Sequence, residues 1–282
     1  GHIDHGKTAL IQALNGFEGD STNEEKQRGI TIDLSFSNLS QGQRNIAFID
    51  VPGHEKLVKN MIAGAFGFDY VMLVVSAAEG IKPQTVEHIE ILNLLGLKEI
   101  IVVITKKDLV SAEDLQVKKE EILEFLDGFD FKIKFMHEVS IFEKESIEKL
   151  KTSLFSINNT IKQEENFFRY YVDRVFSPKG IGTVVTGTVL GKKIDLNEKI
   201  FLCEAQKETK IKNIQVHNEN ALEANISNRA ALNLQGININ QVKRGDLITK
   251  KGFVRGFDEI DIYFKCLKDK KLNHNKTYTL FI

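Results

Sequence analysis

The first eight residues carry the most specific chemistry in the chain, because two glycines frame a short loop that ends in a lysine and a threonine. Gly1, His2, Ile3, Asp4, His5, Gly6, Lys7 and Thr8 fit the pattern G-x-x-x-x-G-K-[ST]. In such a loop backbone N–H groups turn inward around phosphates, the lysine reaches the β and γ oxygens, and the threonine hydroxyl ligates Mg²⁺. A helix expected over residues 7–15 adds the attraction of its dipole, and Ala9 offers a backbone N–H. The pattern predicts a nucleotide site, with a chance glycine-rich turn as the alternative.

A second segment, from Asp50 to His54, follows an apolar strand expected at residues 46–49. Asp50 then lies at the carboxyl end of a strand, where its carboxylate can hold Mg²⁺ through water. The N–H of Gly53 can approach a γ phosphate, and His54 lies where an attacking water has to be oriented, a role that other GTPases give to glutamine. The alternative for His54 is a purely structural histidine.

A third segment, Arg28-Gly29-Ile30-Thr31, ends a polar stretch at residues 18–27 that lacks apolar periodicity and suits a mobile loop. Thr31 can supply a second hydroxyl to Mg²⁺ while the γ phosphate is present and release it afterwards, as in the switch of GTPases. The motif supports this role mainly because it lies between the phosphate loop and Asp50.

A fourth segment, Thr105-Lys106-Lys107-Asp108, ends an apolar strand expected at residues 100–104. The carboxylate of Asp108 can accept hydrogen bonds from N1–H and the N2 amine of guanine, a pair of donors that adenine lacks, so it would select GTP over ATP. The alkyl stem of Lys106 can lie on the base, and backbone at Ser140, after the next strand, can reach guanine O6. An aspartate that merely caps the following turn is the alternative for Asp108.

Two halves with different periodicity must position these segments. Up to about residue 140, strands expected at 46–50, 70–76, 100–105 and 133–140 alternate with helical patterns, including those near 57–65 and 86–95. This alternation predicts a parallel sheet wrapped in helices, with the ligand at the carboxyl ends of the strands. A strand is also expected before Gly1, so both chain ends look like cuts in a longer protein.

Beyond about residue 164 the periodicity changes to two, with glycine-rich turns between short strands, which predicts a closed barrel. The expected strands are 168–176, 182–189, 199–203, 210–216 and 230–234. The predicted fold is an α/β P-loop GTPase domain followed by all-β barrel domains. The expected domains are the GTP-binding domain at 1–165, a β-barrel at 166–255 and the start of a second, incomplete barrel at 256–282.

Composition favours a soluble, cytoplasmic protein. Of the 282 residues 42% are hydrophobic and 27% charged, and no apolar run is long enough for a membrane span or a signal peptide. Only two cysteines occur, Cys203 and Cys266, without metal-ligand spacing, so we expect reduced thiols.

The net charge of −1 hides an asymmetry between the halves. Residues 1–165 hold 18 Lys and Arg against 27 Asp and Glu, whereas residues 166–282 hold 20 against 12. A basic second half suggests that it meets a polyanion. The obvious contributors are the doublets Lys192-Lys193, Lys250-Lys251 and Lys270-Lys271, for which solvated turns are the alternative.

Taken in order, these segments resemble those of the translational GTPases. The sequences at 50–56 and 28–33, and Thr105 in place of asparagine, look more like the bacterial selenocysteine-specific elongation factors than elongation factor Tu. Residues 171–176 and 180–187 are similar to the entry of the family's second domain, a barrel that helps to hold the aminoacyl end of tRNA. The resemblance implies a GTP hydrolase with GTP or GDP and Mg²⁺ as cofactors, which carries selenocysteinyl-tRNA to the ribosome.

The resemblance also implies a selenocysteine pocket at Asp173, Arg174 and Arg229. A selenol is more acidic than a thiol, whose reference pKa is about 8.5, so it is anionic at neutral pH and guanidinium groups would favour it over serine. Neighbours on a regular strand face opposite ways, so Asp173 and Arg174 can share a pocket only through a bulge or a strand end. An Asp–Arg pair elsewhere on the barrel surface is the alternative.

The chain departs from the family in two respects. Ala9 replaces a common threonine or serine, which is harmless if the position uses its backbone N–H. The carboxyl-terminal region that reads a messenger RNA hairpin in this family is absent, so we expect no hairpin binding by this chain. The rival functions are a general elongation factor of the Tu type, a carrier like the gamma subunit of initiation factor two, a P-loop kinase or ATPase, and a nonenzymatic RNA-binding module.

Overall fold

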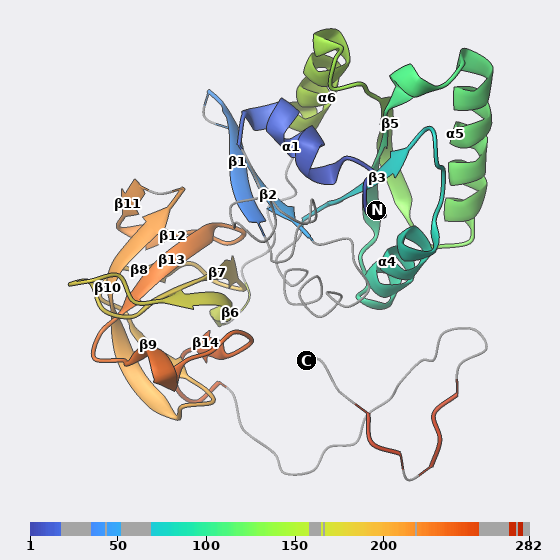
Figure 1. Cartoon of the computed structure of the whole chain (residues 1–282). Helices are drawn as coiled ribbons and strands as arrows, with labels where there is room; N and C mark the ends of the chain where they lie inside the picture. The colour runs from blue at the N-terminus through green and yellow to red at the C-terminus, as the bar shows by residue number, and fades with distance from the viewer. Residues whose placement is uncertain are drawn as a thin grey trace.

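The computed structural model describes residues 1–17, 35–42, 44–51, 69–157, 165, 167–217, 219–253, 271–274 and 276–278. Several sequence predictions lie outside these residues: Thr31, Gly53, His54, Cys266, the helix near 57–65 and most of the expected domain at 256–282. Figure 1 shows the described part as an α/β half and an all-β half. The predicted fold class is confirmed.

The α/β half is built on a parallel sheet in the order β3-β4-β5, with β3 at Val71–Ser76, β4 at Glu99–Thr105 and β5 at Lys132–Glu138. Its helices are α1 at Lys7–Asn15, α4 at Pro83–Leu94, α5 at Ala112–Asp127 and α6 at Lys144–Ser156. A 3₁₀ turn, η2, covers Lys107–Leu109. Strand β4 is buried along almost its whole length, which explains its continuous run of β-branched residues.

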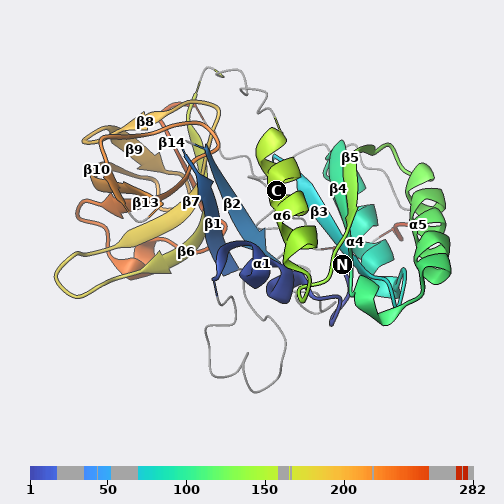
Figure 2. The ribbon, with the colours of Figure 1, turned by 90° about the horizontal axis from the view of Figure 1, so that it is seen from above.

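Successive side chains of the sheet point to opposite faces, and each face has its own core. On one face Val74 and Val103 pack with Leu10 of α1 and Leu150 of α6. On the other face Val75 and Val102 pack with Ile89 of α4 and Ile122 of α5. The sheet is therefore covered by helices on both sides (Figures 1 and 2).

A two-stranded antiparallel hairpin, β1 at Ser35–Gln41 and β2 at Arg44–Asp50, extends toward the all-β half (Figure 2). Its register pairs Ser35 with Asp50 and Phe36 with Ile49. Sequence periodicity indicated β2 but not β1, because the polar residues of β1 outnumber its apolar ones.

The second half is a closed antiparallel barrel of six strands in the order β10-β13-β7-β6-β14-β9, with β9 pairing back to β10. The strands are β6 at Arg169–Phe176, β7 at Val184–Leu190, β9 at Lys199–Leu202, β10 at Lys207–Val216, β13 at Arg229–Leu234 and β14 at Leu247–Thr249. The short strands β8 (Ile194–Asp195), β11 (Glu219–Ala221) and β12 (Glu223–Ala224) lie at its margins.

The barrel core is mostly apolar, and the buried hydroxyl of Tyr170 is hydrogen-bonded inside it. The hydroxyl of the fully buried Tyr170 lies 2.9 Å from the carbonyl oxygen of Ala230 and 3.1 Å from that of Val185, so it is satisfied across the barrel. Gly187 allows β6 and β7 to approach, because a Cβ there would lie 2.3 Å from the carbonyl oxygen of Tyr171.

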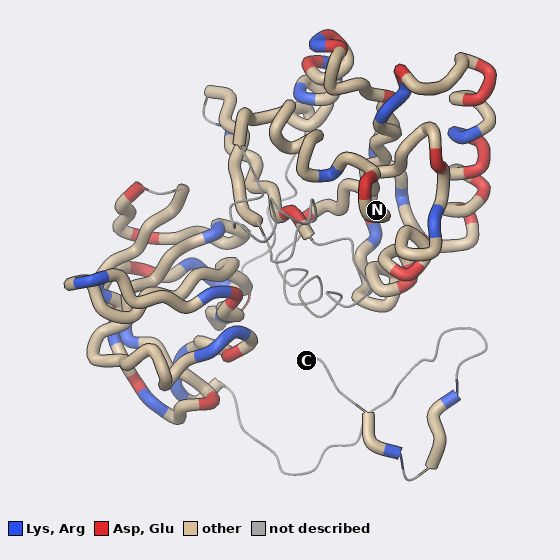
Figure 3. The backbone as a smooth tube through the Cα atoms, in the orientation of Figure 1, with Lys and Arg blue, Asp and Glu red and all other residues tan. Residues whose placement is uncertain are grey.

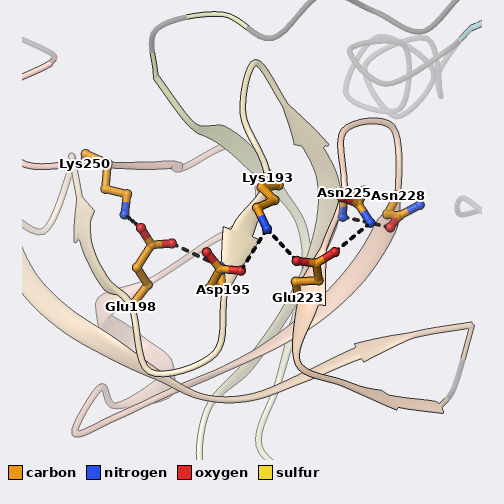
Figure 4. A network of polar contacts seen from close by, with 7 residues as sticks. All are labelled: Lys193, Asp195, Glu198, Glu223, Asn225, Asn228 and Lys250. Atoms are coloured by element: carbon orange, nitrogen blue, oxygen red, sulfur yellow. Dashed lines mark hydrogen bonds and ion pairs between the residues drawn. The ribbon is translucent and has the colours of Figure 1, made fainter.

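In two of the lysine doublets, one lysine makes ion pairs and the other does not. Lys193 pairs with Glu223 at 2.6 Å and Asp195 at 3.5 Å, and Lys250 pairs with Glu198 (Figure 4). Lys192 and Lys251 are exposed and make no ion pair with the described residues. One member of each of these two doublets therefore makes ion pairs within the barrel, while the other is exposed. Figure 3 shows basic and acidic residues interspersed along the backbone of both halves.

None of the helices in the described ranges is long and apolar enough to cross a membrane. The thiol of Cys203 is free and partly buried, and burial raises its pKa to about 11. This thiol is therefore protonated and unreactive at neutral pH.

Candidate functional site

The phosphate loop is closed by the lysine that ends it. Gly6 is the N-cap of α1 and has φ +83°, a left-handed conformation that a residue with a side chain rarely adopts. The Nζ of Lys7 donates to the carbonyl oxygens of His2 at 2.7 Å and Gly1 at 3.2 Å. These bonds curl the loop around the ammonium, leaving the first N–H groups of α1 at a helix N-terminus suited to a phosphate.

The positive charge of the loop comes from Lys7 and not from His5. Burial lowers the pKa of Lys7, and the negative charges of Asp50 and Asp4 act against this. Burial also lowers the pKa of His5 to about 3, so its imidazole is neutral at physiological pH. A bound phosphate would therefore be met by Lys7, the loop amides and a metal ion.

Two oxygen ligands for a metal ion meet beside this loop. The hydroxyl of Thr8 donates to Oδ2 of Asp50 at 2.7 Å, and Asp50 is the last residue of β2. A hydroxyl and a carboxylate are the hard oxygen donors that Mg²⁺ prefers. These two residues could hold magnesium, Thr8 by direct ligation and Asp50 through water.

Thr105 joins the guanine segment to the phosphate loop. Its hydroxyl lies at the end of β4, 2.6 Å from the carbonyl oxygen of His5 and 3.3 Å from that of Val75. Thr105 is buried and its carbonyl accepts from the N–H of Ala77. Threonine in place of asparagine is thus sufficient to hold the two segments together.

Asp108 lies exposed on η2, two residues after Lys106, which has a positive φ of 56°. The helix that follows is capped by Ser111, whose hydroxyl accepts from the N–H of Asp114 at 3.1 Å. Ser111, and not Asp108, is therefore the N-cap of this helix. The ammonium of Lys106 lies 3.8 Å from Glu79, on the same rim.

Ser140 lies buried just after β5, and its backbone is held by Ser146, a residue that no sequence motif indicated. Its N–H donates to Oγ of Ser146 at 3.2 Å, and that hydroxyl is also 2.8 Å from the carbonyl oxygen of Glu143. Ser146, at the start of α6, thus fixes the shape of the 139–143 loop. The N–H of Ser140 is engaged within the protein.

On the barrel, a bulge brings the three expected pocket residues together. In the pairing of β6 with β7, Val172 faces Gly187 and Arg174 faces Thr186, which leaves Asp173 as the extra residue. The two sides of the Asp173 carboxylate are bound by the guanidinium of Arg229, with Nη2 to Oδ1 at 2.9 Å. Thr186 donates to the same Oδ1 at 2.6 Å.

The pair is well shielded from water, with side chains only 8% exposed for Asp173 and 15% for Arg229. Arg229 of this pair and the neighbouring Arg174 both lie against one aromatic ring of the α/β half, that of Phe36 on β1. The guanidinium carbon of Arg229 lies 3.3 Å from the ring centroid and that of Arg174 lies 4.8 Å from it. With one carboxylate and two guanidinium groups, the trio carries a net charge of +1, which one monovalent anion would balance.

The other predicted site residues, Thr31, Gly53 and His54, lie outside the described residues. Within those residues, no cluster of three or more His, Cys, Asp or Glu side chains could hold a further metal ion.

The fold and the site define a class of protein: a P-loop nucleotide-binding α/β domain followed by a six-stranded antiparallel barrel. The chain belongs to the family of the elongation factor Tu GTP binding domain, whose model matches residues 1–238. Guanine nucleotide is therefore the ligand class of the family. The chain is 40% identical over 270 residues to a selenocysteine-specific elongation factor of Desulfomicrobium baculatum, covering 95% of this chain and 43% of that protein.

Solved structures agree with the sequence relatives. The crystal structure of bacterial selenocysteine-specific elongation factor EF-Sec matches with a TM-score of 0.80 and 36% identity, over 89% of this chain and 44% of that one. The structure of translation elongation factor SelB from Methanococcus maripaludis, in complex with the GTP analogue GPPNHP, matches with a TM-score of 0.76 and 30% identity, over 89% of this chain and 53% of that one. The resemblance to selenocysteine-specific elongation factors is confirmed, and the chain spans about half the length of these relatives or less.

Proposed function

We propose that this protein is a GTP-dependent translation elongation factor that delivers selenocysteinyl-tRNA to the ribosome and hydrolyses GTP when the ribosome is engaged. The observation that carries the amino-acid specificity is the trio of Asp173, Arg174 and Arg229, in which a bulge at Asp173 directly precedes Arg174 and the pair of Asp173 and Arg229 is shielded from water. The relatives named as selenocysteine-specific elongation factors support this choice.

GTP or GDP with Mg²⁺ is the proposed cofactor pair. Support comes from the curled phosphate loop, from the Thr8–Asp50 contact at 2.7 Å and from the exposed carboxylate of Asp108 at the guanine end. Magnesium would polarise the phosphate oxygens that it contacts. We assign His54 to orienting the attacking water, Gly53 to the γ phosphate and Thr31 to the metal in the GTP state.

The barrel would receive the amino acid. A selenol is ionised at neutral pH whereas the serine hydroxyl is not, so a pocket with net charge +1 discriminates by charge between two side chains of similar size. Because Asp173 neutralises one arginine, the surplus charge is that of a single guanidinium. This arrangement explains why a carboxylate belongs in a pocket for an anion: it fixes the geometry of Arg229 at two points.

We propose that the protein acts in the cytoplasm, where ribosomes are found. We place the GTP-binding domain at 1–165, the barrel at 166–255 and a further barrel from 256 onward.

The test compares two tRNAs with one variant. We expect Arg174→Ala, in the presence of a GTP analogue, to weaken selenocysteinyl-tRNA binding by roughly 10- to 100-fold, the effect of a charged hydrogen bond, and to leave seryl-tRNA binding unchanged. Arg174 is preferred to Arg229, whose removal would leave the carboxylate of Asp173 buried and unpaired.

The matched control is Lys192→Ala, which removes an exposed cation of the barrel that has no ion-pair partner among the described residues. If Lys192 meets a tRNA phosphate, both tRNAs weaken alike and the slope of affinity against salt falls by about one. Equal losses for both tRNAs in Arg174→Ala would overturn the selenocysteine assignment and favour a general carrier of the elongation factor Tu type or one like the gamma subunit of initiation factor two.

A further inference from the structure

We propose that the ion pair of Lys107 and Glu143 sets the geometry of the base pocket. This pair, the clamp, fastens the guanine segment, which carries Asp108, to the loop at residues 139–143, which carries Ser140. The inference rests on the proposed binding of guanine nucleotide and deepens it. No nucleotide role assigned above uses either member of the clamp, and both act as positioning residues because they reach the base only through their neighbours.

The first support is that Lys107 contacts the 139–143 loop with both its backbone and its side chain. Its N–H donates to the carbonyl oxygen of Val139 at 3.3 Å, and its Nζ lies 2.6 Å from Oε2 of Glu143. Lys107 is the first residue of η2, and Asp108 is the next. A shift of the loop against η2 would therefore move the carboxylate that we expect to bind the base.

The second support is that Glu143 is itself bound to the backbone around Ser140. Glu143 is the N-cap of α6, and its N–H donates to the carbonyl oxygen of Ser140 at 3.0 Å. Its own carbonyl oxygen accepts from the hydroxyl of the buried Ser146 at 2.8 Å, and that hydroxyl also accepts from the N–H of Ser140. A continuous series of bonds thus joins the two sides of the base pocket through the clamp.

The third support is the contrast between two neighbouring lysines. The Nζ of Lys106 lies 3.8 Å from Oε1 of Glu79, a residue that follows β3. The Nζ of Lys107 lies instead against Glu143, which precedes α6. The two side chains therefore face different loops, and Lys107 is the one that contacts the loop carrying Ser140.

The exposure of the clamp decides how large its effect can be. The side chain of Lys107 is 25% exposed and that of Glu143 is 49% exposed, so water and salt screen their attraction. Ion pairs of this kind change an equilibrium by roughly 2- to 5-fold. The clamp therefore adjusts the position of Asp108 and adds little to the stability of the domain.

The experiment measures the affinities for GDP and for IDP, whose base lacks the N2 amine and offers Asp108 one donor in place of two. In Lys107→Ala the GDP affinity should fall by roughly 2- to 5-fold, and the IDP affinity should fall less. The reason is that two hydrogen bonds to one carboxylate constrain its orientation more than one does. The preference for GDP over IDP should therefore shrink, whereas Lys107→Arg keeps the charge and should retain the preference.

Charge reversal tests the pair itself. Lys107→Glu and Glu143→Lys each bring like charges together, so each should weaken GDP binding and lower the preference for GDP over IDP. The double variant restores an ion pair and should recover both. The matched control is Lys151→Ala, because Lys151 is also 25% exposed and its partner Glu148 lies 2.8 Å away on the same helix, α6. This control should change neither affinity.

The outcomes separate the clamp from the proposed function. An unmodified protein without a preference for GDP over IDP would overturn the base-site assignment in the proposed function, and the clamp with it. An unmodified protein that prefers GDP, with the same preference in Lys107→Ala and in both single reversals, would overturn the clamp and leave the proposed function intact. A loss of stability against urea in these variants, at an unchanged ratio of GDP to IDP affinity, would also overturn the clamp, because the pair would then be merely structural.

Discussion

The hydroxyl of Thr105 lies 2.6 Å from the carbonyl oxygen of His5 and joins the end of a buried strand to the middle of the phosphate loop. Both residues are buried, so neither group can turn to water if the other is lost. The bond holds the phosphate and base ends of the nucleotide site at a fixed separation, and the side chain that makes it belongs to the guanine segment.

Thr105→Val keeps the shape of the side chain and removes only this donor. Because the His5 carbonyl would be left without its partner, we expect GDP affinity and the free energy of unfolding each to fall, the latter by about 1–3 kcal/mol. Nucleotide titration and denaturant unfolding measure the two effects. Thr152→Val, at an exposed helical site where the hydroxyl lies 2.9 Å from the carbonyl oxygen of Glu148, is the control and should change neither quantity beyond error.

Asp108→Asn exchanges an acceptor for a donor at the base site. Xanthine carries a carbonyl where guanine carries an amine, so GTP binding should weaken by about 1.5–3 kcal/mol and XTP binding should improve. Competition of the two nucleotides against a fluorescent GDP analogue gives both affinities. An unchanged preference for GTP would remove Asp108 from the base pocket.

His54→Ala should affect the rate of hydrolysis and hardly affect binding. If His54 orients water in the transition state, ribosome-stimulated hydrolysis should fall by roughly 10² to 10⁴ while GTP affinity stays nearly the same. His54→Gln, which can still hold a water, should be less impaired. Normal stimulated turnover in the alanine variant would make His54 a structural residue.

Arg229→Ala should destabilise the barrel, because the buried carboxylate of Asp173 would lose its ion-pair partner. The loss in the free energy of unfolding should be about 3–5 kcal/mol, and adding Asp173→Ala in the same chain should recover much of it. The control is the exposed pair of Lys149 and Glu145 on α6, where Lys149→Ala should leave the free energy of unfolding nearly unchanged. Additive losses in the Asp173 and Arg229 double variant would contradict this reading of the pair.

The sequence by itself determined the local parts of this protein. Helix α1 occupies the expected residues 7–15, because the left-handed glycine before it and the apolar spacing within it act over a few residues. Strands β3 and β4 were predicted within one residue of their bounds, since a strand buried on both faces must be apolar throughout. The sequence predicted a closed barrel from runs in which apolar and polar residues alternate. The short strand β14, which completes the barrel, was not predicted.

Only the tertiary structure decided which distant groups meet. The sequence offered the pocket trio by resemblance and required a bulge, but the bulge depends on how β6 pairs with β7. Helices α5 and α6 were not singled out, and with α6 came Ser146, which holds the loop at Ser140. Phe36 lies in a mostly polar strand, where nothing local marks it for a place over two arginines more than a hundred residues away. Local periodicity reports which face of an element is buried, whereas the partner of that face is chosen by the packing of the whole chain.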